Sequence, residues 1–223
     1  MKVRPTILSL FLIFAAQNLW GQKVFIPEQG EGIVFTASSL SISGAPSSFV
    51  PSNRSNAYAI QVFREQIIGL SHFSIAGGLG YSGQFYHGNI HIEVAENGEQ
   101  NEVLLSEGSF KSNRFATEYA DALLEFRYRG IANKKGRFTR VYVGGFVGYK
   151  TNAYSHLHTS NYEVKYYHIQ GFNPLRYGVY IRAGKGPINL SASVGLSPLV
   201  SSGAMLTDWS EATSSSVGLS LML

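Results

Sequence analysis

Residues 187–198 read PINLSASVGLSP, and alternate residues along this stretch are apolar. Successive side chains of a β-strand point to opposite faces. The stretch therefore predicts a strand with one wholly apolar face and one small, polar face. The apolar face would carry Ile188, Leu190, Ala192, Val194 and Leu196, and the polar face Asn189, Ser191, Ser193, Gly195 and Ser197.

The same two-residue period recurs along the chain and predicts an all-β fold. The register of the first strand stays open, because Ile33, Val34 and Phe35 are consecutive apolar residues. The pattern predicts eight strands, at residues 32–42, 56–63, 72–84, 118–129, 137–150, 175–184, 187–198 and 214–223.

The connections between these strands alternate between short and long. The short connections are 64–71, 129–137 and 184–187, and the long ones are 43–54, 85–115, 151–172 and 199–213. Outer-membrane barrels have tight turns on the periplasmic side and longer loops outside the cell. The pattern therefore predicts an eight-stranded antiparallel up-and-down transmembrane β-barrel with long extracellular loops.

Alternation alone does not decide whether lipid or water surrounds the strands, because soluble sandwiches and lipocalin-type barrels alternate as well. In the predicted strands 118–129, 137–150 and 175–184, the charged side chains fall on the small, polar face. Tyr128, Tyr149 and Tyr177 lie toward strand ends on the apolar face, where an interfacial aromatic girdle belongs. Both features favour lipid outside, with a secreted soluble β-barrel as the alternative.

The N-terminal residues have the three parts of a secretory signal. Lys2 and Arg4 precede an apolar stretch at 7–16, and a small residue, Gly21, ends the segment. The apolar stretch is shorter than the roughly 20 residues of a membrane-spanning helix. We predict a signal peptide at 1–21, an outer-membrane barrel domain at 22–223, and export to the bacterial outer membrane by the secretory pathway.

Composition excludes several classes of site. The chain has no cysteine, so lipoprotein attachment, disulfides and cysteine-based sites are absent. Cleavage after residue 21 would leave 16 of the 18 basic residues against all 14 acidic ones, a formal charge of +2. So small an excess does not favour a nucleic-acid partner.

Several short segments together resemble the PorT-like outer-membrane β-barrel proteins of the Bacteroidota. The segments are LEFRY at 124–128, YVGGFVGY at 142–149, YGV at 177–179 and VGLSL at 217–221. The resemblance implies eight strands and, for most members, no assigned activity, whereas the founding member serves a protein-secretion apparatus. Such barrels usually end in an aromatic residue that the insertion machinery recognises, and this chain has Leu223 there.

Six charged residues fall on the face that would line the interior. An eight-stranded barrel has room for side chains but not for an open pore. Charges placed there must be paired, because an isolated buried charge costs several kcal/mol. We expect a lumenal charge network that fills the barrel, with a proton or ion path as the alternative. Its members are Asp121, Glu125, Arg127, Arg140, Arg176 and Arg182.

The segment 151–172 carries the residues that come nearest to a reactive site. His156 and His158 have a spacing that suits Zn²⁺ if Glu163 or His168 supplies a third ligand. His158, Ser160 and Glu163 are similar to the arrangement in outer-membrane lipid A deacylases. A solvated loop explains both patterns more simply, so we expect no metal, no cofactor and no catalytic residue.

The sequence is most consistent with a non-enzymatic outer-membrane barrel that is an envelope structural element or a partner-binding component, including a secretion-linked one. A lipid A deacylase-like hydrolase and a narrow solute channel are the alternatives. The expected partners are membrane lipids and lipopolysaccharide, the barrel-insertion machinery and an envelope protein, without nucleic acid.

Overall fold

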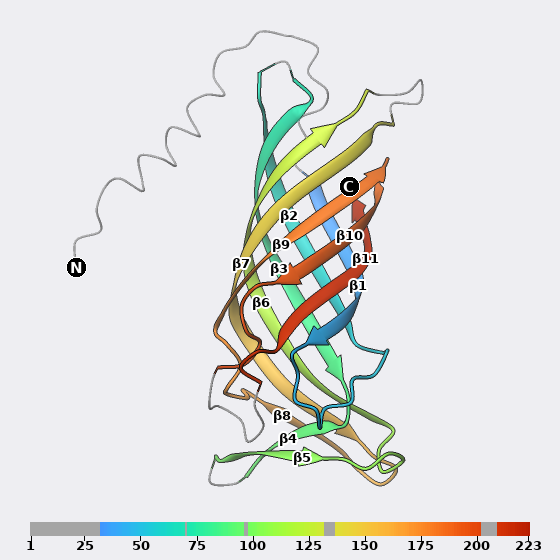
Figure 1. Cartoon of the computed structure of the whole chain (residues 1–223), viewed down its shortest axis with the longest axis vertical. Helices are drawn as coiled ribbons and strands as arrows, with labels where there is room; N and C mark the ends of the chain where they lie inside the picture. Colours follow the sequence, from blue (N-terminus) through green and yellow to red (C-terminus); the bar gives the residue numbers. More distant parts are fainter. Residues whose placement is uncertain (1–31, 70, 96–97, 132–136, 202–208) are drawn as a thin grey trace, which may run out of the picture.

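A ring of eight antiparallel strands forms the body of the molecule in the computed structural model, which describes residues 32–69, 71–95, 98–131, 137–201 and 209–223 (Figure 1). Each neighbouring pair is hydrogen-bonded, and the last strand pairs with the first. In ring order the strands are β1 (Gly32–Ser43), β2 (Asn56–Ile67), β3 (Phe73–His87), β6 (Ser112–Arg129), β7 (Thr139–His158), β9 (Leu175–Lys185), β10 (Ile188–Gly195) and β11 (Thr213–Met222).

The eight predicted strands are confirmed, and the open register of the first one is now fixed. Val34 is fully buried inside the ring, whereas its neighbours Ile33 and Phe35 are exposed on the outside. The predicted signal peptide at 1–21 lies outside the described residues.

The prediction of a connection at 64–71 was wrong, because β2 continues to Ile67 and the connection shrinks to 68–72. Residues 64–67 pair with the start of β3, and their alternation continues that of the preceding residues. Gly69, with φ +60°, adopts the left-handed conformation that this tighter turn requires.

The two ends of the ring differ. One end, here called the turn end, carries the three short connections. The start of β1 and the end of β11 lie there as well. The other, called the loop end, carries the long connections, which lie at the bottom of Figure 1. The long connections predicted at 85–115 and 151–172 are shorter than expected, because both segments contain paired strands.

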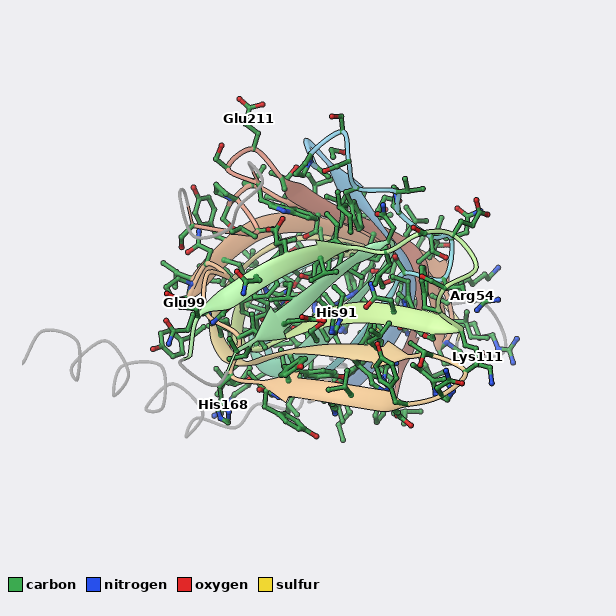
Figure 2. All side chains as sticks on the ribbon, turned by 90° about the horizontal axis from the view of Figure 1, so that it is seen from below. Arg54, His91, Glu99, Lys111, His168 and Glu211 are labelled. Carbon is green, nitrogen blue, oxygen red and sulfur yellow. The ribbon has the colours of Figure 1, made fainter. Side chains whose placement is uncertain are left out.

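At the loop end, β4 (Ile90–Val94) and β5 (Gln100–Leu104) form a separate two-stranded sheet. The strand β8 (Glu163–Tyr167) pairs with the far end of β7. Figure 2 looks onto this end, with His91 of β4 near the centre of the view. We call β4, β5, β8 and the adjoining ends of β6 and β7 the platform.

A β-bulge in β7 separates its ring portion from its platform portion. The register between β6 and β7 shifts between Glu118 and Tyr119, so that Thr151 of β7 is not paired with any residue of β6 in the ladder. An extra residue reverses the alternation of faces. Lys150 therefore points inward before the bulge, whereas Ala153 and Ser155 point inward after it.

The outside of the ring carries a broad apolar band. Its exposed side chains include Ile60, Val62, Leu79, Leu124, Phe126, Val143, Val179, Ile181, Leu190, Val217 and Leu219. Such a surface suits hydrocarbon rather than water. Among the described residues, no helix is long and apolar enough to cross a bilayer.

Candidate functional site: the interior of the ring

All six charged residues predicted to line the interior lie on its inner face. Asp121, Glu125 and Arg127 come from β6, Arg140 from β7, and Arg176 and Arg182 from β9. Five of them take part in ion pairs, which fall into two groups.

The first group, called the Glu125 network, lies in the half of the interior nearest the turn end. Glu125 is fully buried and accepts a hydrogen bond from Arg127 Nε at 2.6 Å and a second from Arg182. Arg127 Nη1 also lies 3.1 Å from Glu65 Oε2, and Arg129 pairs with the same carboxylate. Two carboxylates thus hold three guanidinium groups, which reduces the cost of burying them.

Neutral groups complete this network. Arg182 donates to the side-chain oxygen of Gln61, and Ser74 donates to Glu65. The Arg127 guanidinium lies over the rings of Phe63 and Tyr142, with 4.8 Å from Cζ to each centroid. These contacts place the charges between aromatic walls, where pairing is stronger than in water.

The second group is a single pair nearer the loop end. Arg176 Nη2 lies 2.9 Å from Asp121 Oδ1 and 3.0 Å from Oδ2. Ser82 of β3 donates to the same carboxylate. A cavity of about 80 Å³ adjoins this pair and is lined in part by hydroxyl-bearing side chains. It has room for only a few waters.

Two glycines of β7 leave room on the inner face for side chains of the neighbouring strands. The Asp121–Arg176 and Glu125–Arg182 pairs join β6 to β9, so each must cross the inner face of the strand between them. Gly148 lies in register between Asp121 and Arg176, and a Cβ there would be 2.3 Å from Asp121 Oδ1. Gly144 likewise leaves room for Tyr180, 2.6 Å from the position of its missing Cβ. Close approach of neighbouring side chains is therefore the role of both glycines.

Glu65 is a buried interior residue that sequence reasoning missed. It is buried and binds two arginines, but it lies in a segment that was predicted to be a turn. The signal was present, since Gln61, Phe63 and Glu65 continue one alternation on the inner face of β2.

Arg140 differs from the other five predicted residues. Within the described residues it forms no ion pair. Its Nη1 lies 3.4 Å from Met222 Sδ, and its guanidinium lies over Phe138, 4.6 Å from the centroid. It is only half-buried at the turn end, where water can solvate the charge.

The interior of the loop end is apolar. Phe115 is at its centre, in ring contact with Tyr86, Phe172 and Trp209 at centroid distances of 5.0, 5.6 and 5.7 Å. We call this cluster the apolar plug, and its buried members are Leu40, Phe49, Tyr86, Ile90, Ile92, Phe115, Ala153, Ile169, Phe172, Leu199, Val200, Trp209 and Ala212. More than half of these lie outside the eight ring strands, so the connections fold inward to make it.

A buried polar cluster ties β4 to the ring beside this plug. His91 Nδ1 is 3.1 Å from Asn113 Oδ1 and 2.9 Å from Ser155 Oγ. Both contacts use the same ring nitrogen, whereas a nucleophile–base–orienter relay needs the two nitrogens separately. Asn113 also donates to the carbonyls of Gly88 and Ile90. The cluster therefore fastens the hairpin to the ring.

The histidine-rich segment lies on the outer surface of the platform. Glu163 Oε1 is 2.6 Å from His156 Nε2, and its Oε2 is 3.7 Å from His158 Nδ1. Ser160 is exposed in the turn between β7 and β8, and no hydrogen bond within the described residues joins it to His158. His168, the other candidate ligand, is exposed with φ +57°. Across the described ranges, no group of three potential ligands could hold a metal ion.

Comparison with known proteins agrees with this geometry. A family model described as outer membrane protein beta-barrel domain matches residues 32–200, which is most of the chain. The matched region contains seven of the eight ring strands and the whole platform. No curated protein and no solved structure matches the chain significantly.

Proposed function

Because the chain belongs to the outer membrane β-barrel domain family and is located in the bacterial outer membrane, we propose that it is a non-enzymatic partner-binding component of the envelope. The single observation that carries the proposal is the platform. A ring filled with side chains presents, at one end, an ordered surface of paired strands. Binding surfaces are commonly placed on connections held by such a rigid scaffold.

The platform is tied to the ring through β4 and β8. Ile90 and Ile92 of β4 are buried in the apolar plug, and His91 between them contacts Asn113 and Ser155. The strand β8 pairs with β7 over five residues. A partner would therefore meet a surface that is already ordered, which lowers the entropic cost of binding.

We also propose that the loop end faces the outside of the cell and the turn end the periplasm, as in other outer-membrane barrels. A peptide tag inserted at Gly108 should be labelled on intact cells, and a tag at Gly69 should be labelled only after the membrane is permeabilised. Both glycines are exposed turn residues with positive φ and no neighbouring atom within 4 Å of an added Cβ. Labelling of Gly69 alone on intact cells would reverse the orientation.

The resemblance to PorT-like proteins supports a secretion-linked form of this role. It predicts that the partner is another envelope protein and not a soluble ligand. Family membership supports the barrel and its location, and the PorT-like resemblance adds the secretion link as a proposal.

The partner-binding proposal can be tested with exposed side chains of β5 and of the turn that leads into β8. Leu104 and Tyr162 are both more than half exposed. Cross-linking in intact cells, followed by mass spectrometry, should identify an envelope protein whose cross-links are lost in Leu104→Ser with Tyr162→Ser. The matched control is Ile131→Ser, since Ile131 is exposed at the turn end. Cross-links that are equally lost in the control, or retained in both, would contradict a platform-bound partner.

The second candidate is a lipid hydrolase, which the proximity of Glu163 to His158 favours. It requires Ser160 to act as the nucleophile from an exposed turn. Lipid A whose mass changes in cells with the wild-type protein, but not with Ser160→Ala, would establish this activity and displace the binding proposal.

A further inference from the structure

Four basic or titratable side chains form one row across the outside of the ring, at the border of the platform. His87 of β3 pairs in register with Arg114 of β6, Arg114 with His156 of β7, and His156 with Lys165 of β8. The sequence neighbours of His87, Arg114 and His156 point into the apolar plug or its polar cluster, so these three point outward, and Lys165 is exposed on β8. We call them the basic row.

An aromatic row lies two residues closer to the middle of the ring. Phe85 pairs with Ala116, Ala116 with Tyr154, and Tyr154 with Tyr167. The guanidinium of Arg114 lies 5.5 Å from the Phe85 centroid. Tyrosine and phenylalanine at this height form the girdle at the membrane surface. The basic row therefore lies where lipid headgroups begin.

Lys165 joins the two rows at their other end. Its Nζ lies 4.2 Å from the ring centroid of Tyr154 and 4.6 Å from that of Tyr167. The ammonium thus lies against both rings, and Lys165 as a whole is exposed.

Two side-chain nitrogens of the basic row have unused hydrogen-bonding capacity. Arg114 Nε and His87 Nδ1 are buried atoms without a hydrogen-bond partner among the described residues. Arg114 also forms no ion pair within the described ranges. A planar guanidinium with free N–H groups suits an oxyanion with several acceptors.

The surroundings of the row are positive. Arg114 and Arg54 both lie close enough to His87 to act on it electrostatically. Figure 2 shows Arg54 and Lys111 on the same side of the loop end, and the Lys111 amide donates to the carbonyl of His158 at 2.8 Å.

The neighbouring carboxylates already have partners. Glu163 pairs with His156 and His158. Glu118, on the other side of the aromatic row, accepts from Tyr81 at 2.8 Å and from Asn152 at 3.1 Å. Among the described residues, neither carboxylate forms an ion pair with Arg114 or Lys165.

We propose that the basic row binds a phosphate group of a phosphorylated glycolipid in the outer leaflet, with the acyl chains alongside the aromatic row. Arg114 and Lys165 carry the charge recognition, and the rings beneath them fix the depth of the lipid. The site rests on the proposed orientation of the loop end but not on a protein partner, because lipid binding is measured on the isolated protein. The tag experiment at Gly108 and Gly69 tests the orientation separately.

The test uses purified protein in a neutral detergent and bisphosphorylated lipid A as the probe, with binding measured by native mass spectrometry. Arg114→Gln with Lys165→Gln should weaken binding roughly tenfold or more, since charge-assisted hydrogen bonds to phosphate are lost. The matched control, Arg64→Gln with Lys185→Gln, removes two exposed charges from the turn end and should leave binding within about twofold. A gel-mobility shift on heating confirms that each variant is folded, and Lys165→Gln alone is the fallback variant.

Two further probes identify what is bound. Lipid A stripped of its phosphates should bind the wild-type protein as weakly as the doubly substituted variant binds the intact lipid. Inorganic phosphate at millimolar concentration should compete poorly, because it lacks the chains that contact the aromatic row. Equal binding of the stripped lipid, equal loss in the control variant, or full competition by free phosphate would each overturn the proposal.

Discussion

The two halves of the ring interior are filled by different chemistry. Toward the turn end, the Glu125 network consists almost entirely of strand residues that reach across one intervening strand. Toward the loop end, the apolar plug consists largely of residues from connections that fold inward. Charged filling requires each partner to be in place, because an unpaired buried charge is costly, whereas apolar filling depends on volume. The first half should therefore be sensitive to single charge changes and the second to loss of volume.

The largest effect is expected at Glu125. Glu125→Ala leaves both Arg127 and Arg182 without their shared carboxylate. We expect a loss of about 5 kcal/mol in the free energy of unfolding, the upper end for a broken buried pair. Urea unfolding of the refolded protein in lipid vesicles measures it. The control Glu107→Ala, at an exposed position, should change stability by less than about 0.5 kcal/mol. Equal stability of the two variants would mean that the network does not stabilise the ring.

A smaller loss is expected in the apolar plug. Phe115→Ala removes the ring that contacts Tyr86, Phe172 and Trp209. We expect a loss of about 3 kcal/mol, the low end for such a substitution, because the connections around the ring can partly close the cavity. The same urea titration measures it. Phe115→Leu should recover much of the loss, and a failure to do so would contradict filling by volume alone.

The charged half of the interior can be predicted from the sequence better than the apolar plug can. The charges of β6 and β9 lie on a regular alternation, so their common face can be predicted from sequence. Glu65 could have been included by extending the same alternation along β2. The inward position of Ser155 could not be predicted, because the bulge at Thr151 reverses the alternation and arises from pairing between strands. The plug depends on contacts between residues such as Phe49 and Trp209, 160 positions apart, which a local pattern cannot contain.

A third test concerns pH and distinguishes the loop end from the turn end. Burial lowers the pKa of His91 from its usual 6.5. The unfolded chain therefore takes up a proton near pH 6.5 while the folded platform still excludes it, so stability falls as the pH drops below 6.5 toward the folded pKa. Hydrogen exchange of the β4 amides should accelerate between pH 7.5 and 5, relative to the intrinsic rate. His91→Gln should weaken this pH dependence, whereas His72→Gln, an exposed change at the turn end, should retain it.

The smallest effect is expected at Arg140. This substitution tests whether an interior charge stabilises the ring by its position alone or only when it is paired. Arg140 shares the inner face with Arg182 but has no carboxylate partner among the described residues, and its positive neighbours include Arg129 and Arg127. Arg140→Gln should change the free energy of unfolding by less than about 0.5 kcal/mol, because the lost contact with Phe138 is offset by reduced repulsion. Arg182→Gln, measured in parallel, should cost several times more, since it leaves Glu125 with one guanidinium fewer. If the two substitutions cost the same, pairing would not determine which interior charges stabilise the ring.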